Sequence, residues 1–235
     1  MKFYRPLYLF SAIAFFAVAC SPDESVYQQD ILQNPACRNI IKLKDKRDAK
    51  ALIPYFIDVD YQLRQQAVMA FGSFKDTAAL NSLYTMLEED EPIAQAAAFS
   101  IGQIGDTRSV SVLQRILERS FLPETRFEIY DAMGKCGTIE LNYYLASNYN
   151  VNKDAKGTAW ALMELANKKQ LNPAGVTLAI TILENENDKD VRFGAANALA
   201  RTQIQIPWKR VKHQFLKENL QDVKMALALD LRTVP

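Results

Sequence analysis

Apolar residues recur at helical spacing along most of the chain, and from about residue 47 onward this pattern repeats with a period near 32 residues. Each repeat holds two amphipathic stretches joined by short polar turns, with no strand-like alternation between them. One such pair cannot bury its own apolar face, so neighbouring pairs must stack. The pattern therefore predicts an all-α chain, a right-handed α-solenoid of about six helix pairs.

The second stretch of each unit opens with an acidic residue that is followed by a cation, as in Asp60–Arg64 and Asp190–Arg192, except in the second unit, where Ala94 takes the place of the cation. Acidic residues are favourable at the N-terminal turn of a helix, because the free N–H groups and the helix dipole lie there. The equivalent positions along the chain are 64, 94, 126, 156, 192 and 224, so six units fit. Gly72, Gly102 and Gly134 follow three of the apolar faces, and we expect each to end its helix in the left-handed conformation.

Three segments carry a resemblance to a known family: Leu52-Ile53-Pro54, Asp60–Arg64 and the run from Ala96 to Asp106. They resemble HEAT repeats, in which a proline at the place of Pro54 kinks the first helix. The resemblance extends over the repeats and defines a HEAT-repeat domain at residues 47–235. It implies a fold and says almost nothing about function.

The N-terminus has the pattern of a secretory signal. Lys2 and Arg5 precede an apolar run from Leu7 to Ala19, which is too short to span a bilayer. Small residues before Cys20 resemble a bacterial lipobox, which implies a lipoprotein signal peptide at residues 1–19 and lipid attachment at Cys20. Ser21 then implies an outer-membrane lipoprotein that faces the periplasm of the bacterial cell envelope. Residues 20–46 are expected to be a tether with a capping helix.

Composition excludes several kinds of site. The chain has 28 Lys and Arg against 27 Asp and Glu, which predicts no nucleic-acid partner. His213 is the only histidine, so a catalytic zinc centre with two histidines is excluded. Cys37 and Cys136 lie several repeats apart and are expected to be free thiols. The chain shows no phosphate-binding loop, and we therefore expect no catalytic residues, no metal site, no cofactor and no enzymatic activity.

Two sets of residues are candidates for a binding face. The cations Arg64, Arg126, Lys156 and Arg192 would either pair with acidic residues of adjacent units or form a basic stripe for an anionic ligand. Tyr130 and Trp160 occupy the same register in consecutive units, and would form either a protein-binding hot spot on an inner face or part of the core.

The leading functional hypothesis is a non-enzymatic scaffold that is held at the membrane by its lipid and binds a protein or peptide in the envelope. The C-terminal repeat ends without a polar cap, and it is a candidate for self-association. A second hypothesis rests on the stretch from Arg47 to Thr138. It looks like the HEAT half of envelope lipoproteins whose other half is a cyclophilin-type prolyl isomerase, which implies an accessory subunit of such an enzyme. A phycobilin lyase-like enzyme, a class that also uses HEAT-like repeats, is the third hypothesis.

Overall fold

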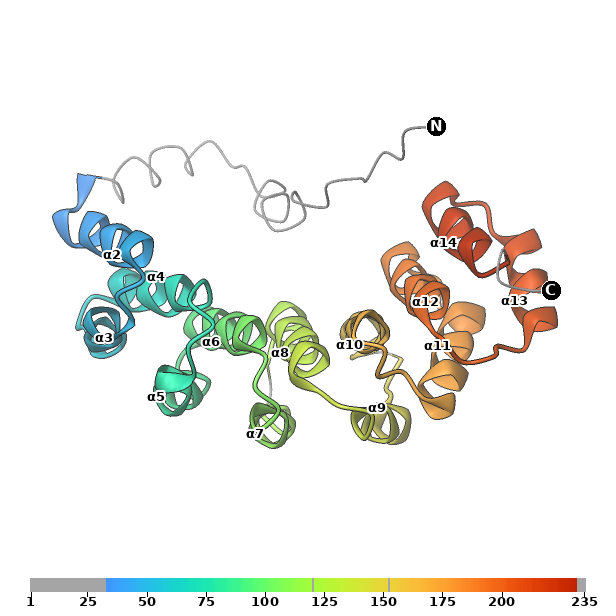
Figure 1. Cartoon of the computed structure of the whole chain (residues 1–235), viewed down its shortest axis with the longest axis horizontal. Helices are drawn as coiled ribbons and strands as arrows, with labels where there is room; N and C mark the ends of the chain where they lie inside the picture. The colour runs from blue at the N-terminus through green and yellow to red at the C-terminus, as the bar shows by residue number, and fades with distance from the viewer. Residues whose placement is uncertain (1–32, 120, 152, 232–235) are drawn as a thin grey trace.

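Helices in two layers form an open arc (Figure 1). The computed structural model describes residues 33–231 apart from residues 120 and 152, and these residues form helices and no strand. The predicted signal peptide, Cys20 and the first part of the tether lie outside the described residues. Within the described part of the chain, every helix is too short or too polar to span a lipid bilayer.

The inner layer holds the second helix of each unit. These helices are α4 (Tyr61–Phe71), α6 (Glu91–Ile104), α8 (Pro123–Cys136), α10 (Ala155–Asn167), α12 (Lys189–Arg201) and α14 (Gln221–Leu231). Each packs against the next along the row, so that the inner helices form a continuous stack on the concave side of the arc (Figure 1).

The outer layer holds the first helices. They are α3 (Ala49–Leu52) with the 3-10 helix η2 (Ile53–Ile57), η3 (Thr77–Ala79) with α5 (Leu80–Met86), α7 (Ser109–Ile116), α9 (Leu141–Asn148), α11 (Pro173–Asn185) and α13 (Trp208–Lys217). The six pairs confirm the predicted α-solenoid. A further helix, α2 (Pro35–Lys46), precedes them and packs against α4 through the buried Cys37 and Ile40.

Helix starts follow the predicted chemistry. The carboxylate of Asp60 accepts hydrogen bonds from two backbone N–H groups at the start of α4, and Asp188 does the same for α12. Pro92 and Pro123 lie in the first turn of α6 and α8, where their missing N–H costs nothing.

The predicted helix ends are wrong at two glycines, and the third, Gly72, ends α4 with φ of −54° and not in the left-handed conformation. Gly102 and Gly134 lie inside α6 and α8, which continue to Ile104 and Cys136. Their role is close packing: a Cβ atom at Gly102 would lie 2.9 Å from the Cα of Ala132, and one at Gly134 would lie 2.7 Å from the Cα of Ala161. Gly105, with φ of 73°, ends α6 instead, because this left-handed conformation costs glycine little.

Candidate binding groove on the inner helices

The predicted cations of the second helices form ion pairs between successive units. Arg64 lies 3.9 Å from Glu89, Arg126 lies 2.7 Å from Asp154, Lys156 lies 3.6 Å from Asp190 and Arg192 lies 2.9 Å from Glu218. Asp154 and Asp190 lie at the start of the next inner helix, and Glu89 and Glu218 lie in the turn before it. Each ion pair therefore joins one inner helix to the next unit. Of the two predicted roles for these four cations, their contacts match pairing with acidic residues of adjacent units.

The three arginines share a second contact. Their guanidinium groups also donate to backbone carbonyls of the turn within their own unit: Arg64 to Asp58, Arg126 to Leu117 and Arg192 to Asn187. A planar guanidinium can donate in two directions at once, which an ammonium group cannot do in the same fixed geometry. These arginines therefore tie the turns to the next unit and present little charge to an anionic ligand.

Tyr130 lies in the core. Only 3% of its surface is exposed, and a Cβ atom at Gly157 would lie 2.7 Å from the Cβ of Tyr130. Helix α10 therefore approaches α8 closely at Gly157 and covers the tyrosine. Burial raises the pKa of Tyr130 well above its ordinary value, and the charge of Asp154 adds to this effect. The structure thus separates the predicted pair of aromatic residues.

Trp160 belongs to a different aromatic row. Its ring centroid lies 6.0 Å from that of Phe127 on α8 and 6.2 Å from that of Phe193 on α12, with both ring pairs tilted. All three rings are partly exposed. They come from three consecutive helices of the inner layer, so the row runs across the concave side of the arc.

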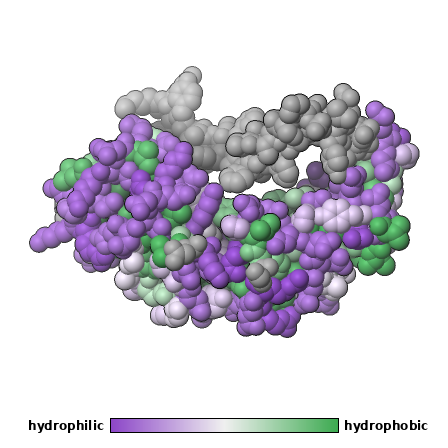
Figure 2. Space-filling view, turned by 180° about the vertical axis from the view of Figure 1, so that it is seen from behind, coloured by the Kyte–Doolittle hydropathy of each residue, from purple (hydrophilic) through white to green (hydrophobic). Residues whose placement is uncertain are grey.

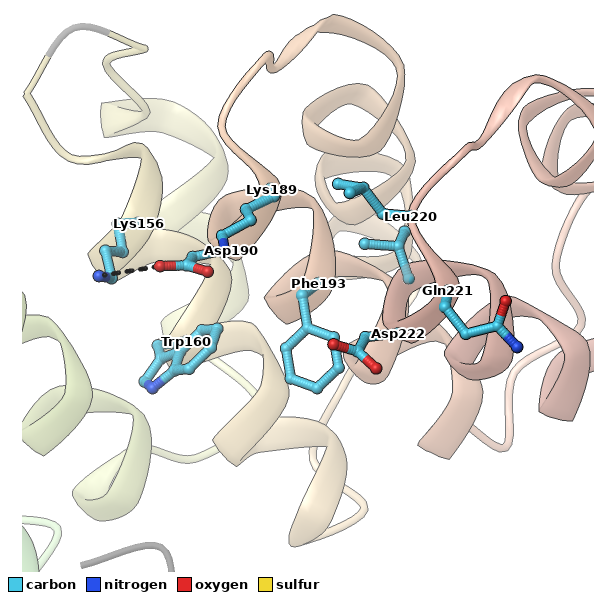
Figure 3. Close-up of a pocket in the computed structure, with 9 residues that line it drawn as sticks. Lys156, Trp160, Lys189, Asp190, Phe193, Leu220, Gln221 and Asp222 are labelled. Atoms are coloured by element: carbon cyan, nitrogen blue, oxygen red, sulfur yellow. Dashed lines mark ion pairs between the residues drawn. The ribbon is translucent and has the colours of Figure 1, made fainter. Parts of the chain in front are cut away.

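The row borders a cavity of about 320 Å³ between α10, α12 and α14 (Figure 3). Trp160 and Phe193 line it together with Leu220 and Val223, and charged side chains stand around them. Lys156 lies at this rim, paired with Asp190 and 5.5 Å above the ring of Phe127. The lining residues lie on inner-layer helices, apart from Leu220, which directly precedes α14. The cavity is therefore part of the concave side.

Beside the aromatic row lies a group of charged side chains from α8 and α10. Asp131 is 7% exposed and forms an ion pair with Lys135, one turn further along α8. Burial raises the pKa of Glu164 and, to about 7, that of Glu128; the charge of Asp131 adds to both effects and Lys135 opposes them. We define the aromatic row, the cavity and these charged residues together as the inner groove.

The remaining candidates for chemistry lie apart from the inner groove. His213 is exposed on α13 of the outer layer. Cys37 and Cys136 are buried and free, and burial raises the pKa of the Cys136 thiol to about 12. Within the described residues, no group of three or more His, Cys, Asp or Glu side chains could hold a metal ion.

Sequence reasoning did not single out Phe127 and Phe193. Each directly follows the cation of its unit, as Arg126-Phe127 and Arg192-Phe193. That recurrence was a usable signal, but the register comparison matched Trp160 with Tyr130. The match failed because residues three apart share a helix face: Trp160 lies three residues after Gly157, which holds in its own unit the place of Phe127 and Phe193.

Comparison with known proteins agrees with the repeat assignment. A family model described as HEAT repeats matches residues 49–134. A solved structure, the complex of CpcE and CpcF of phycocyanin lyase from Nostoc sp. PCC7120, is similar at 19% sequence identity and a TM-score of 0.49. The similarity covers 83% of this chain and 85% of that chain. No curated protein matches the chain, and the expected resemblance to isomerase-linked lipoproteins is not found.

These findings correct the leading functional hypothesis. The interpretation as a non-enzymatic scaffold is withdrawn: the comparison gives a lyase complex as a similar solved structure, and nothing in it supports a non-enzymatic role. At 19% identity the likeness concerns the fold, and it assigns no activity to this chain. The described chain is an α-solenoid in which residues 49–134 match HEAT repeats.

Proposed function

We propose that this protein binds an extended segment of another polypeptide in the inner groove. The observation that carries the proposal is the row of three partly exposed aromatic rings, Phe127, Trp160 and Phe193, beside a cavity of about 320 Å³. Aromatic side chains in a hollow are typical anchors of protein interfaces, because they bury a large apolar area at a small cost in side-chain entropy.

The dimensions of the groove favour a polypeptide segment. A cavity of about 320 Å³ is at the small end of the range for small-molecule pockets and has room for one or two side chains. The rings continue from this cavity across α10 to α8, where a neighbouring part of the same segment would lie. Consecutive repeats thus offer consecutive contacts to an extended chain.

Binding of this kind is compatible with catalysis, since an enzyme that acts on a polypeptide must also hold it. The proposal therefore concerns what the groove binds and leaves the chemistry to be measured. A linear tetrapyrrole is the alternative occupant of a surface lined by aromatic rings. An absorption titration with biliverdin tests it directly, because a bound tetrapyrrole changes its visible spectrum.

Selection of a displayed library of random dodecapeptides on the full chain tests the proposal. We expect peptides to be enriched, and Trp160→Ala or Phe193→Ala to weaken the enriched peptides about tenfold or more. Tyr143→Ala is the matched control, because Tyr143 is an exposed aromatic residue on α9 of the outer layer. The proposal is wrong if no peptide is enriched, if the groove variants bind like the control, or if biliverdin saturates the groove.

A second proposal concerns the N-terminus, which lies outside the described residues. We propose that Cys20 carries a lipid that holds the protein in the outer membrane of the bacterial envelope. The support is the basic start and the apolar run from Leu7 to Ala19, with small residues before the cysteine. Labelled palmitate should enter the wild-type chain and not Cys20→Ala; equal labelling of both would refute this attachment.

A further inference from the structure

Glu128 on α8 is a carboxyl group without a partner. It is partly buried beside Phe127, and within the described part of the chain it makes no hydrogen bond or ion pair. Burial raises its pKa to about 7, and the nearby charge of Asp131 contributes in the same direction. The protein therefore holds this acid in a place where its charged form is poorly stabilised.

The neighbouring charges do not supply the missing cation. Lys135 pairs with Asp131 and lies 6.0 Å from the ring of Phe99 on α6. Lys168, just after α10, donates its N–H groups to the backbone carbonyls of Lys135 and Gly137.

The third acid of the group, Glu164, accepts a long hydrogen bond of 3.4 Å from Asn167. The charges that act on one another here are Glu128, Asp131 and Glu164 against Lys135 and Lys168, so three carboxyl groups face two ammonium groups. One negative charge is left without a counterpart, and Glu128 is the group that lacks a contact.

This surplus charge adjoins the aromatic row. Asp131 lies four residues after Phe127 on α8, and Glu164 lies four residues after Trp160 on α10. Residues four apart are neighbours on a helix surface, so both acids stand one turn from a ring of the row. Carboxylate oxygens and the faces of aromatic rings both favour a cation, because both present negative electrostatic potential, and the ammonium group of Lys156 already lies 5.5 Å from the centroid of the Phe127 ring.

We propose that the polypeptide segment bound in the inner groove carries a lysine or arginine whose cationic head lies against Glu128, on the helix that also carries Phe127. This inference rests on the proposed function and specifies the partner's chemistry: an extended segment with a basic side chain near an apolar one. The apolar side chain enters the cavity at Trp160 and Phe193, and the basic side chain supplies the counter-charge on α8.

The peptide selection described above gives the first test. Peptides enriched on the wild-type chain should carry Lys or Arg at one position more often than the unselected library. This preference should disappear on Glu128→Gln, which keeps the shape of the side chain and removes its charge. Glu140→Gln, at an exposed acidic position just before α9 in the outer layer, should keep the preference.

A double-mutant cycle gives the second test. In the most enriched peptide, replacing its preferred Lys or Arg by Gln should weaken binding to the wild-type chain about tenfold. The same replacement should change binding to Glu128→Gln by less than about twofold. If peptides bind through Trp160 and Phe193 without a basic preference, or if the two mutations add independently, the basic subsite is refuted while the groove stands. If no peptide binds, both proposals fail.

The affinity should also depend on pH. A cation binds to ionised Glu128, so binding releases a proton wherever the free carboxyl group is protonated. The affinity for the basic peptide should therefore rise between about pH 6 and pH 8, around the pKa of about 7. The Gln-substituted peptide should show no such rise, and an equal rise for both peptides would refute the role of Glu128.

Discussion

Two successive junctions of the inner stack hold equivalent ion pairs in different surroundings. Between α8 and α10, Arg126 and Asp154 are 15% and 7% exposed at the side chain; between α10 and α12, Lys156 and Asp190 are 39% and 50% exposed. The first pair is covered by its neighbours, and the second stands at the rim of the inner groove (Figure 3). The same position of the repeat thus joins neighbouring helices at a covered site at one junction, and borders the binding surface at the next.

The glycines at the same two junctions differ in a parallel way. A Cβ atom at Gly134 would meet the backbone of Ala161, at 2.7 Å from its Cα. At Gly194 it would meet the ring of Trp160, at 2.5 Å from the nearest carbon. A backbone cannot move aside, whereas a ring at the surface can rotate. Changes at the first junction should therefore alter stability, and changes at the second should alter the groove.

The largest effect is expected for Asp154→Ala. It leaves Arg126 without a counter-charge in a buried site, which costs about 3 kcal/mol in the free energy of unfolding. Urea denaturation measures this loss. Asp190→Ala is the matched control at the exposed junction and should cost less than about 1 kcal/mol. Equal losses for the two variants would remove the distinction between the junctions.

Gly134→Ala should give an intermediate effect. The added methyl group forces α8 and α10 apart, at a cost of about 1–3 kcal/mol. Alanine's higher helix propensity returns only about 0.5–1 kcal/mol of this. The melting temperature should therefore fall, and an unchanged value would mean that the two helices do not approach each other as closely as the 2.7 Å distance requires.

Gly194→Ala should change stability little and the groove strongly. The gain of about 0.5–1 kcal/mol in helix propensity offsets most of the cost of turning the Trp160 ring. The tryptophan fluorescence should shift, measured with Trp208→Phe in the background so that Trp160 is the only emitter. Peptide affinity should fall together with the shift. A stability loss as large as that of Gly134→Ala would contradict this reading.

The smallest effect is expected for Lys156→Ala. The ion pair with Asp190 is 3.6 Å long and largely solvated, so its loss should cost less than about 1 kcal/mol. Salt should remove most of the difference between this variant and the wild type, since exposed pairs are screened. A loss above about 2 kcal/mol would place Lys156 with the buried arginines instead.

The repeat made the fold predictable, because spacing and helix-start chemistry are local properties of the chain. Asp60 caps its helix, Pro54 interrupts the first helix as the resemblance implied, and the cations fall in equivalent places. The glycines were harder to interpret. A glycine inside a helix for close packing and one that ends a helix look alike in sequence, and only the partner at Ala132 or Ala161 decides between them.

The candidate site was only partly predictable for a related reason. Trp160 was found, but its unit has Gly157 where the neighbouring units have Phe127 and Phe193, and a comparison position by position does not show that residues three apart share a helix face. Glu128 carried no signal at all. Its surplus charge becomes visible only when the contacts of Asp131, Lys135 and Lys168 have been assigned.

Exposed hydrophobic side chains occur at both ends of the arc. Seen from behind, hydrophobic side chains gather in separate patches, one of them at the end that carries the first units (Figure 2). Ile57 and Val59, in the turn before α4, are among the exposed aliphatic residues of that end, and Leu220 and Met225 are exposed at the other. Self-association through the C-terminal repeat stays a prediction.

A cavity of about 460 Å³ lies between α7 and α9 on the outer side of the arc. At this junction the inner helices touch at Gly134 and Ala161, while the outer helices leave open space that is lined by polar side chains such as Tyr144 and Asn148. The two units are thus in close contact on the inner side of this junction and separated by open space on its outer side. If α7 and α9 came together about that contact, the arc would flatten at this junction, and the angle between α8 and α10, which carry Phe127 and Trp160, would change with it.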